Sequence, residues 1–210
     1  MAEFLTYIVD NAGAIGARTL EHVLLVLAAL ALALPVGTGI GILLSRPFMR
    51  RLKEPGFYFV SLSQTIPSLA ILALAVGVLG VGALPAIIAI FLYILFPVAR
   101  NTFAGLQSVP PSALDAARGM GMTSGQMLRR IELPLALPFL IAGIRTAAVY
   151  GISAGALAYL IGGGGLGDFI FTGISLFKPE AMLAGAIPTA ALALCTDYAL
   201  ERLTRKSRRG

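Results

Sequence analysis

The sequence predicts an all-α integral membrane protein with about five transmembrane helices, an N-terminal interfacial helix and a short helical segment on the cytoplasmic side. Three observations support this prediction. Of the 210 residues, 58% are hydrophobic and 12% are charged, which is about half the charged fraction of a soluble domain. Apolar runs long enough to cross a bilayer recur along the chain, and the basic residues gather between them. We therefore treat residues 1–210 as one transmembrane domain.

An amphipathic segment precedes the first apolar run. In residues 1–22, apolar side chains recur at helical spacing from Phe4 to Ile15, with acidic residues among them. This pattern predicts a lead-in helix that lies at the membrane interface. His22 ends the segment, and we expect it at the level of the lipid headgroups, without a role as a ligand. Five spans follow, with approximate bounds 23–44, 57–78, 84–99, 135–161 and 180–200.

Two of the spans carry small residues at intervals of four. The first span contains Gly37 and Gly41. The fourth contains a longer row, formed by Gly143, Ala147, Gly151 and Gly155. Such rows let the backbones of two membrane helices approach closely. We therefore expect both rows at helix–helix contacts.

The second span opens with an unusually polar run. Ser61, Gln64 and Ser68 share one face of a helix, and Pro67 frees a backbone carbonyl one turn earlier. Polar groups that face lipid are costly, so this face is expected to turn inward. It would meet either a partner helix or a water-filled path, and the sequence favours neither alternative.

Arg145 is the one basic residue within a predicted span. A cation at that depth must reach the interface, pair with an acidic residue or face a hydrated interior. Asp197 and Glu201, in and after the last span, are expected to balance neighbouring cations. The candidate residues for a path across the membrane are Ser61, Gln64, Thr65, Tyr93 and Arg145.

The longest polar passage between two spans covers residues 104–134. Ser112 and Asp115 are spaced as a capping box after two prolines, which predicts the start of a short helix. Gly119 and Gly121 are natural places for that helix to end.

A second short helix follows in the same passage. Thr123 and Gln126 form another capping box, and Pro134 stands where the next apolar helix would begin. Two short helices joined to the flanking spans suit the transmission of movement. They contain no nucleophile–base pair and no cluster of metal ligands. We therefore expect no catalytic, cofactor-binding or metal-binding residue in this chain.

A run of glycines, residues 162–165, follows the fourth span. It is not a phosphate-binding loop, because no Lys-Ser/Thr pair follows it and no strand precedes it. The glycines predict a sharp reversal, after which Asp168 would cap a short helix that extends to Phe177.

The basic residues predict the orientation. Thirteen of the sixteen Lys and Arg fall in segments 45–56, 100–133 and 201–210. The positive-inside rule places these segments in the cytoplasm, with the N-terminus outside. The formal net charge of +6 fits anionic lipid headgroups better than nucleic acid, because the cations flank apolar spans.

The passage at residues 104–134 also carries a family resemblance. Asp115-Ala116-Ala117, Gly121 and Ile131-Glu132-Leu133-Pro134 have the spacing of the cytoplasmic coupling loop in permeases of binding-protein-dependent ABC importers. In that family the acidic residue is usually Glu. The resemblance implies a type I importer fold and an ATPase contact that uses Asp115, Ala116, Ala117, Gly119, Gly121, Ile131, Leu133 and Pro134.

Further segments resemble the osmoprotectant branch of these importers, namely residues 64–70, 96–102, 119–123, 142–146 and 163–170. This resemblance implies a bacterial inner-membrane permease that carries glycine betaine, choline or carnitine. Its implied partners are two ATPase subunits that bind ATP and Mg, a second permease that is a copy or a paralogue, and an extracytoplasmic binding protein.

Two alternatives stay open at this point. The chain could serve an importer of another small solute, such as an amino acid. It could also be a stand-alone secondary transporter, although it lacks inverted halves and an acidic residue placed mid-membrane to couple an ion.

Overall fold

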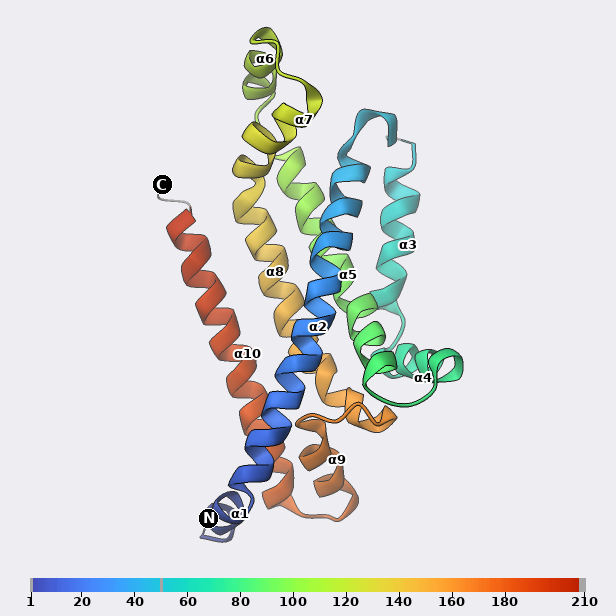
Figure 1. Ribbon diagram of the computed structural model, residues 1–210, viewed down its shortest axis with the longest axis vertical. Coiled ribbons are helices and arrows are strands. Elements are labelled where there is room, and N and C mark those ends of the chain that lie inside the picture. The colour runs from blue at the N-terminus through green and yellow to red at the C-terminus, as the bar shows by residue number, and fades with distance from the viewer. Residues whose placement is uncertain (1, 50, 208–210) are drawn as a thin grey trace.

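The computed structural model describes residues 2–49 and 51–207, and this part of the chain folds into helices. Four long helices lie along the long axis of the bundle, namely α2 (Ala12–Ser45), α5 (Ala83–Gln107), α8 (Leu133–Gly155) and α10 (Pro179–Ser207) (Figure 1). Among the described residues, four helices are long and apolar enough to cross a membrane, and they include these segments. The predicted all-α membrane fold is confirmed. Spans 23–44, 84–99 and 180–200 lie within α2, α5 and α10, and span 135–161 covers α8 and the 3₁₀ turns of η3 (Ala156–Ile161).

The row in α2 and the first part of the row in α8 lie where these helices meet α5, while Gly155 at the end of the second row faces α2. A methyl group added at Gly41 would come 2.6 Å from Cβ of Thr102, and one added at Gly143 would come 2.7 Å from Cβ of Asn101. Both partners belong to α5, so α5 packs closely against α2 through one row and against α8 through the other. The expected helix–helix contacts are confirmed. They place α5 at the centre of the bundle.

The N-terminal segment differs from the prediction. A short helix, α1 (Ala2–Asp10), ends at Asn11, and α2 starts at Ala12, well before the expected start of the span. Residues 12–22 are therefore the first turns of α2 rather than part of a separate interfacial helix. The reason is local, because the only interruption of the helix falls at Asn11, whose side chain donates a hydrogen bond to the carbonyl of Tyr7.

His22 packs between α2 and α8. Its side chain is fully buried, and Nε2 lies 2.9 Å from the carbonyl oxygen of Ile152 in α8. The absent side chains of Gly155 and Gly165 make room for the ring. His22 therefore joins α2 to the last turns of α8, and its level in the membrane stays a prediction.

The predicted second span is divided. Instead of one helix over 57–78, the structure has α3 (Lys53–Thr65) and α4 (Ser68–Leu79). In Figure 1, α3 runs alongside α5, whereas α4 lies across the bundle. Ile66, the residue before Pro67, is extended, with ψ of 129°, because the proline ring disfavours a helical conformation there. The assumption of a shared helical face for Ser61, Gln64 and Ser68 fails for Ser68.

Two short helices follow α5, as predicted. They are α6 (Pro111–Gly119) and α7 (Ser124–Met127), and one π-type turn, η2 (Leu128–Glu132), joins α7 to α8. Thr123 and Gln126 form the expected capping box, with hydrogen bonds of 3.3 Å and 2.8 Å. The capping box proposed for Ser112 is wrong. Pro110 precedes the helix and Pro111 begins it, so Ser112 already lies inside the first turn.

The opposite end of the bundle contains α9 (Gly167–Ser175). The glycine run reverses the chain with positive φ angles at Gly162, Gly164 and Gly165. Asp168 does not cap α9. Its carboxylate instead pairs with Arg18 of α2 at 2.7 Å, because the first turn of α9 lies beside the start of α2.

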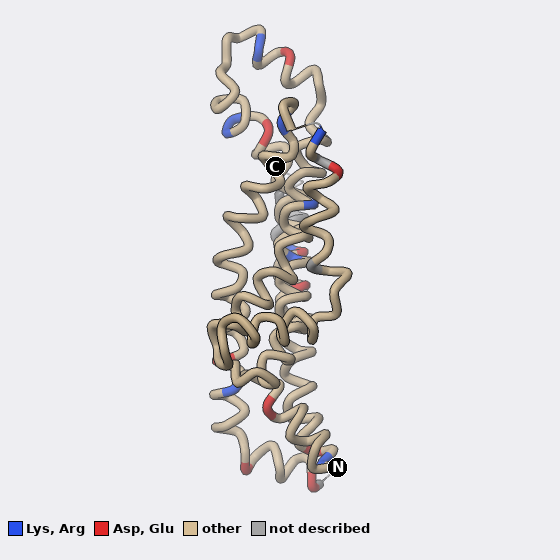
Figure 2. The backbone as a smooth tube through the Cα atoms, turned by 90° about the vertical axis from the view of Figure 1, so that its right-hand side faces the viewer, with Lys and Arg blue, Asp and Glu red and all other residues tan. Residues whose placement is uncertain are grey.

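Charged residues are unevenly distributed along the bundle. Figure 2 shows that Lys and Arg gather at the end that carries α6 and α7. Of the basic residues counted for the orientation, Arg50, Arg208 and Arg209 lie outside the described residues. The inside and outside assignment of the two ends stays a prediction.

Candidate functional site

The predicted coupling loop forms an arm that extends beyond the ends of the other helices (Figure 1). We use "the arm" for α6, α7 and η2. Asp115 and Arg118 form an ion pair of 2.7 Å on α6, and their side chains are 70% and 61% exposed. An exposed pair of this kind contributes at most about 1 kcal/mol, so Asp115 can exchange Arg118 for another cation at little cost. Ala116 faces outward, whereas Ala117 is fully buried.

The turn out of α6 depends on Gly121. Its φ of +73° lies in the left-handed region, and its N–H donates to the carbonyl of Arg118 at 2.9 Å. The N–H of Met122 donates to the carbonyl of Ala117 at 3.1 Å. These two bonds make a Schellman motif, which favours glycine at this position. No described atom would touch a methyl group there, so the requirement for glycine comes from the backbone alone.

An ion pair anchors the base of the arm, and the sequence analysis missed it. Glu132 is 8% exposed, and its carboxylate oxygens accept hydrogen bonds from the guanidinium of Arg46 at 2.5 Å and 3.3 Å. Arg46 directly follows α2, and Glu132 directly precedes Leu133, the first residue of α8. The pair therefore ties the arm to the end of α2. Glu132 was an unspecified position in the loop motif, and only its place as the sole acidic residue between Asp115 and Asp168 distinguishes it.

The remaining predicted coupling residues lie around these points. Gly119 is the exposed last residue of α6, Ile131 is half-buried in η2, and Pro134 lies in the first turn of α8. Their contact with an ATPase stays a prediction.

The predicted path residues do not all come together. Gln64 of α3 donates a hydrogen bond of 3.3 Å to the carbonyl of Tyr93 in α5. The hydroxyls of Ser61 and Thr65 donate to carbonyls of their own helix, at 2.7 Å and 3.0 Å. Gln64 and Tyr93 are thus neighbours, while Ser61 and Thr65 lie on the helix that holds Gln64 beside α5.

Arg145 belongs to a different contact. Its guanidinium binds both carboxylate oxygens of Asp197 and lies 3.4 Å from Glu201, and both acids belong to α10. The sequence left three alternatives for Arg145, which were to reach the interface, to pair with an acidic residue or to face a hydrated interior. The structure shows pairing with acidic residues. The partners are the two acidic residues that were expected to balance a cation.

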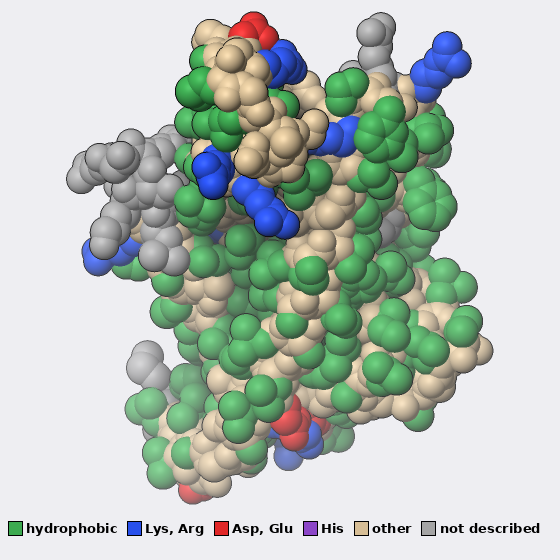
Figure 3. Space-filling model, turned by 45° about the horizontal axis from the view of Figure 1, so that its top comes forward, with side chains coloured by type: hydrophobic (Ala, Val, Ile, Leu, Met, Phe, Trp, Pro, Cys, Tyr) green, Lys and Arg blue, Asp and Glu red, His purple; other side chains and the backbone are tan. Residues whose placement is uncertain are grey.

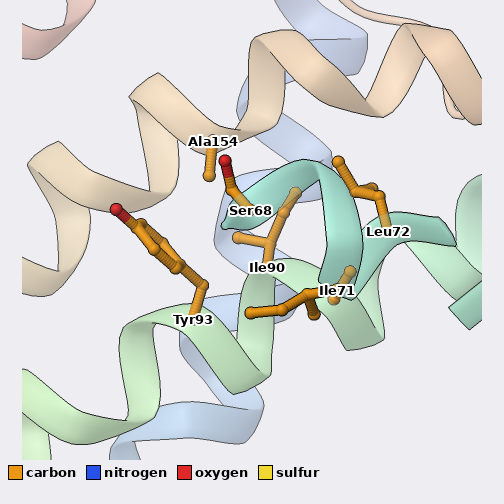
Figure 4. Close-up of a pocket in the computed structure, with 7 residues that line it drawn as sticks. Ser68, Ile71, Leu72, Ile90, Tyr93 and Ala154 are labelled. Carbon is orange, nitrogen blue, oxygen red and sulfur yellow. The ribbon is translucent and has the colours of Figure 1, made fainter. Parts of the chain in front are cut away.

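A recess opens beside Tyr93, between the start of α4, α5 and α8. Figure 4 shows its inner part, where the hydroxyl of Ser68 points toward Ala154 and the ring of Tyr93 reaches toward α8. This part measures about 10 Å³, room for no more than one water. The outer part measures about 140 Å³. We call the outer part the tyrosine recess; its lining residues are Ser68, Tyr93, Tyr150, Ser153, Ala154 and Leu157.

Tyr150 and Ser153 are additions to the predicted path residues. Their spacing of three in α8 places them on one helical face, and this spacing is the sequence signal that relates them. The rings of Tyr93 and Tyr150 are 6.0 Å apart between centroids, with an angle of 39° between their planes.

The described residues bring together no group of three His, Cys, Asp or Glu side chains that could hold a metal ion.

Comparison with known proteins gives a consistent picture. Residues 37–209 match the family described as "Binding-protein-dependent transport system inner membrane component". The chain is 42% identical over 206 residues to the "Glycine betaine/carnitine/choline transport system permease protein OpuCB" of Bacillus subtilis, covering 98% of this chain and 94% of that protein. It is 44% identical to the "Carnitine transport permease protein OpuCB" of Listeria monocytogenes, over 97% and 92% of the two chains.

The solved structures agree on the fold. The methionine ABC transporter MetNI, in an inward-facing form, matches with a TM-score of 0.82 at 22% identity, over 92% of this chain and 96% of the other. An amino acid ABC transporter matches with a TM-score of 0.79 at 19% identity, over 97% and 98%. The architecture is therefore shared with these two transporters.

Proposed function

The chain belongs to the family of binding-protein-dependent transport system inner membrane components, and from this we propose that it forms part of the path of an ATP-driven importer for quaternary-ammonium osmoprotectants. Its substrate would be glycine betaine, choline or carnitine. The observation that carries the proposal is the similarity, at about two residues in five and over nearly the whole chain, to permeases named for these compounds. The structural likeness to methionine and amino acid transporters supports the fold and does not bear on the substrate.

The arm is the element that would receive mechanical work. α6 would lie in a groove of an ATPase subunit, with Asp115 against a basic partner there and Ala116 keeping the contact thin. Two ATPase subunits would bind ATP and Mg, so this chain needs no catalytic residue or cofactor of its own. Closure of the two subunits around ATP would draw the arms of two permeases together.

Movement of the arm would reach the membrane through two routes. η2 continues directly into α8, and the Arg46–Glu132 ion pair would pass force to the end of α2. Because α5 packs against both α2 and α8, the three helices would move together. The spans would open alternately to either side, and hydrolysis would reset them.

The arm would stand in the cytoplasm of a bacterium, with the N-terminus outside the inner membrane. Figure 3 shows basic side chains around the arm and mainly apolar side chains on the visible face below it. Arg129 and Arg130 line a groove of about 520 Å³ along the arm. Cations placed at the boundary with an apolar surface suit the anionic headgroups of the cytoplasmic leaflet. An extracytoplasmic binding protein would deliver substrate at the opposite end.

Reconstitution tests this proposal. The chain is co-expressed with the ATPase, binding protein and any second permease encoded beside it, purified through a tag on this chain, and placed in liposomes. We expect the ATPase to co-purify and labelled glycine betaine, choline or carnitine to enter only with ATP and binding protein. Uptake of an amino acid instead of these compounds would contradict the proposed substrate and assign the chain to an importer of another small solute. Uptake by the chain alone under an ion gradient would support a secondary transporter and contradict the proposal.

A further inference from the structure

We infer that the tyrosine recess holds the quaternary-ammonium substrate during its passage, with Tyr93 and Tyr150 facing the trimethylammonium group and Ser68 and Ser153 facing the polar end. This inference rests on the proposed function and adds residues, a binding mode and a position in the membrane to it.

The two tyrosines supply the faces that such a cation requires. A quaternary ammonium cannot donate a hydrogen bond, so proteins hold it against the electron-rich faces of aromatic rings. The centroids of Tyr93 and Tyr150 are 6.0 Å apart, and their planes are inclined by 39°. Both rings line the recess and come from different helices, α5 and α8, so they could supply two walls of an aromatic cage.

The serines supply the other pole. The Ser153 hydroxyl donates to the carbonyl of Val149 at 3.1 Å, which leaves its oxygen lone pairs available to a ligand. Among the described residues the Ser68 hydroxyl has no hydrogen-bond partner, and it points toward Ala154 in the wall of the recess (Figure 4). Ser68 can therefore donate to the carboxylate of glycine betaine or carnitine, or to the hydroxyl of choline.

Tyr93 is held in place by its neighbours. The side chain of Gln64 donates to the Tyr93 carbonyl at 3.3 Å, which fixes α3 against α5 at this level. The break at Pro67 then brings Ser68, the first residue of α4, to the recess. The polar run in the predicted second span therefore serves both alternatives left open above, because Gln64 joins helices and Ser68 lines the recess.

The depth of the recess fits a path across the membrane. Tyr93 is ten residues after Ala83, which is about 15 Å along α5, and the apolar core of a bilayer is about 30 Å thick. Tyr150 is 41% exposed, and Ser153 is exposed on the same side. Hydroxyl groups at this depth are poor neighbours for lipid. We place this open side against the second permease, so the test uses the assembled importer.

The test compares substitutions that keep or remove the aromatic face. In the reconstituted importer, Tyr93→Leu and Tyr150→Leu should each lower the ATP-driven uptake of choline per assembled complex by about tenfold, while Tyr93→Phe and Tyr150→Phe stay within about threefold of the unsubstituted protein. Tyr198→Leu, in α10 outside the recess, is the matched control and should leave uptake unchanged. If the Leu and Phe variants behave alike, the inference is wrong.

A second readout does not depend on the amount of folded protein. A hydrogen bond to a carboxylate is stronger than one to a neutral hydroxyl. Ser68→Ala and Ser153→Ala should therefore lower the ratio of glycine betaine to choline uptake by several fold within one preparation. An unchanged ratio in both variants removes the serines from the site and overturns the binding mode. If the unsubstituted importer carries an amino acid and no quaternary-ammonium compound, both the proposed function and this inference fail.

Discussion

Arg46 and Glu132, 86 residues apart in the chain, form a two-bonded ion pair with distances of 2.5 Å and 3.3 Å at the base of the arm. The pair joins the residue after α2 to the residue before α8. Arg46 lies outside the motif that identified the arm, and Glu132 occupies an unspecified position of it, yet their ion pair links the arm directly to a second long helix.

Removing one partner of this pair should destabilise the protein. Glu132→Leu leaves the guanidinium of Arg46 partly buried without its counter-charge, a change that costs about 3 kcal/mol. The double variant Arg46→Leu/Glu132→Leu should recover much of that loss, because no charge is left unpaired. Thermal unfolding of the detergent-purified importer measures both. Arg118→Leu, which breaks an exposed pair, serves as the control and should cost less than about 1 kcal/mol; equal losses in the single and double variants would contradict this account.

Gly121 should determine how well hydrolysis is coupled to transport. A β-branched residue is strained at a φ of +73°, so Gly121→Val should disturb the turn out of α6. No described atom lies near an added Cβ at this position, so the effect would come from backbone strain rather than from a clash. We expect ATP hydrolysis to persist while uptake falls at least about fivefold. Gly121→Asn is the matched variant, since Asn enters the left-handed region at lower cost, and it should retain most of the uptake. Normal coupling in Gly121→Val would show that the motif is not needed.

Because α2 and α5 approach closely at Gly41, adding even one methyl group to this residue should lower the stability of the protein. Its added methyl group would lie 2.6 Å from Cβ of Thr102 and 2.7 Å from the carbonyl oxygen of Ala99. Gly41→Ala should therefore lower stability by about 1–3 kcal/mol, as overpacking does. Gly39→Ala, two residues away with nothing near its added methyl, should be neutral or slightly stabilising. Thermal unfolding of the two variants decides the point, and a similar shift in both would rule out a packing effect.

Arg145 should depend on Asp197 for its place in the bundle. Asp197→Leu removes the acid that binds the guanidinium through both oxygens, and it leaves the cation of α8 poorly balanced at membrane depth. The yield of folded protein in detergent should fall, and Arg145→Leu/Asp197→Leu should restore part of it. A double variant that is no better than the single one would assign the effect to Asp197 alone.

Labelling should place the arm in the cytoplasm. In a Cys195→Ala background, Ala116→Cys puts a thiol on the exposed face of α6, and Ser175→Cys puts one at the exposed end of α9. An impermeant maleimide added to intact cells should label the second position and not the first. The reverse pattern would invert the proposed orientation.

Local patterns predicted the parts of the fold that depend on neighbouring residues. The glycine rows, the Thr123–Gln126 capping box and the left-handed turn at Gly121 follow from spacing within a few residues, and the structure contains each of them. The division of the second span did not follow, because a proline between apolar runs can either kink a helix or end it. Which outcome occurs depends on the packing of α3 and α4 against α5, and the spacing of residues within one segment does not predict that packing.

The candidate site was partly predictable for the same reason. The arm has its own sequence signature, and Gln64 was singled out because polar groups in a span need a partner. Tyr150 was missed, because its nearness to Tyr93 arises from the pairing of two helices that are far apart in sequence. Arg46–Glu132 and His22–Ile152 were missed in the same way, since each contact spans much of the chain.

The division of the second span at Pro67 has a consequence for hydration. Every helix end leaves amide and carbonyl groups without partners inside the helix, and hydrocarbon cannot satisfy them. Lipid could surround the surface of an unbroken helix, because the backbone groups along its length are paired. Lipid cannot satisfy the unpaired backbone groups at the break between α3 and α4. We therefore expect water, a polar side chain or another polypeptide to reach the level of Ile66 and Pro67, where the bilayer would give way to a polar interior.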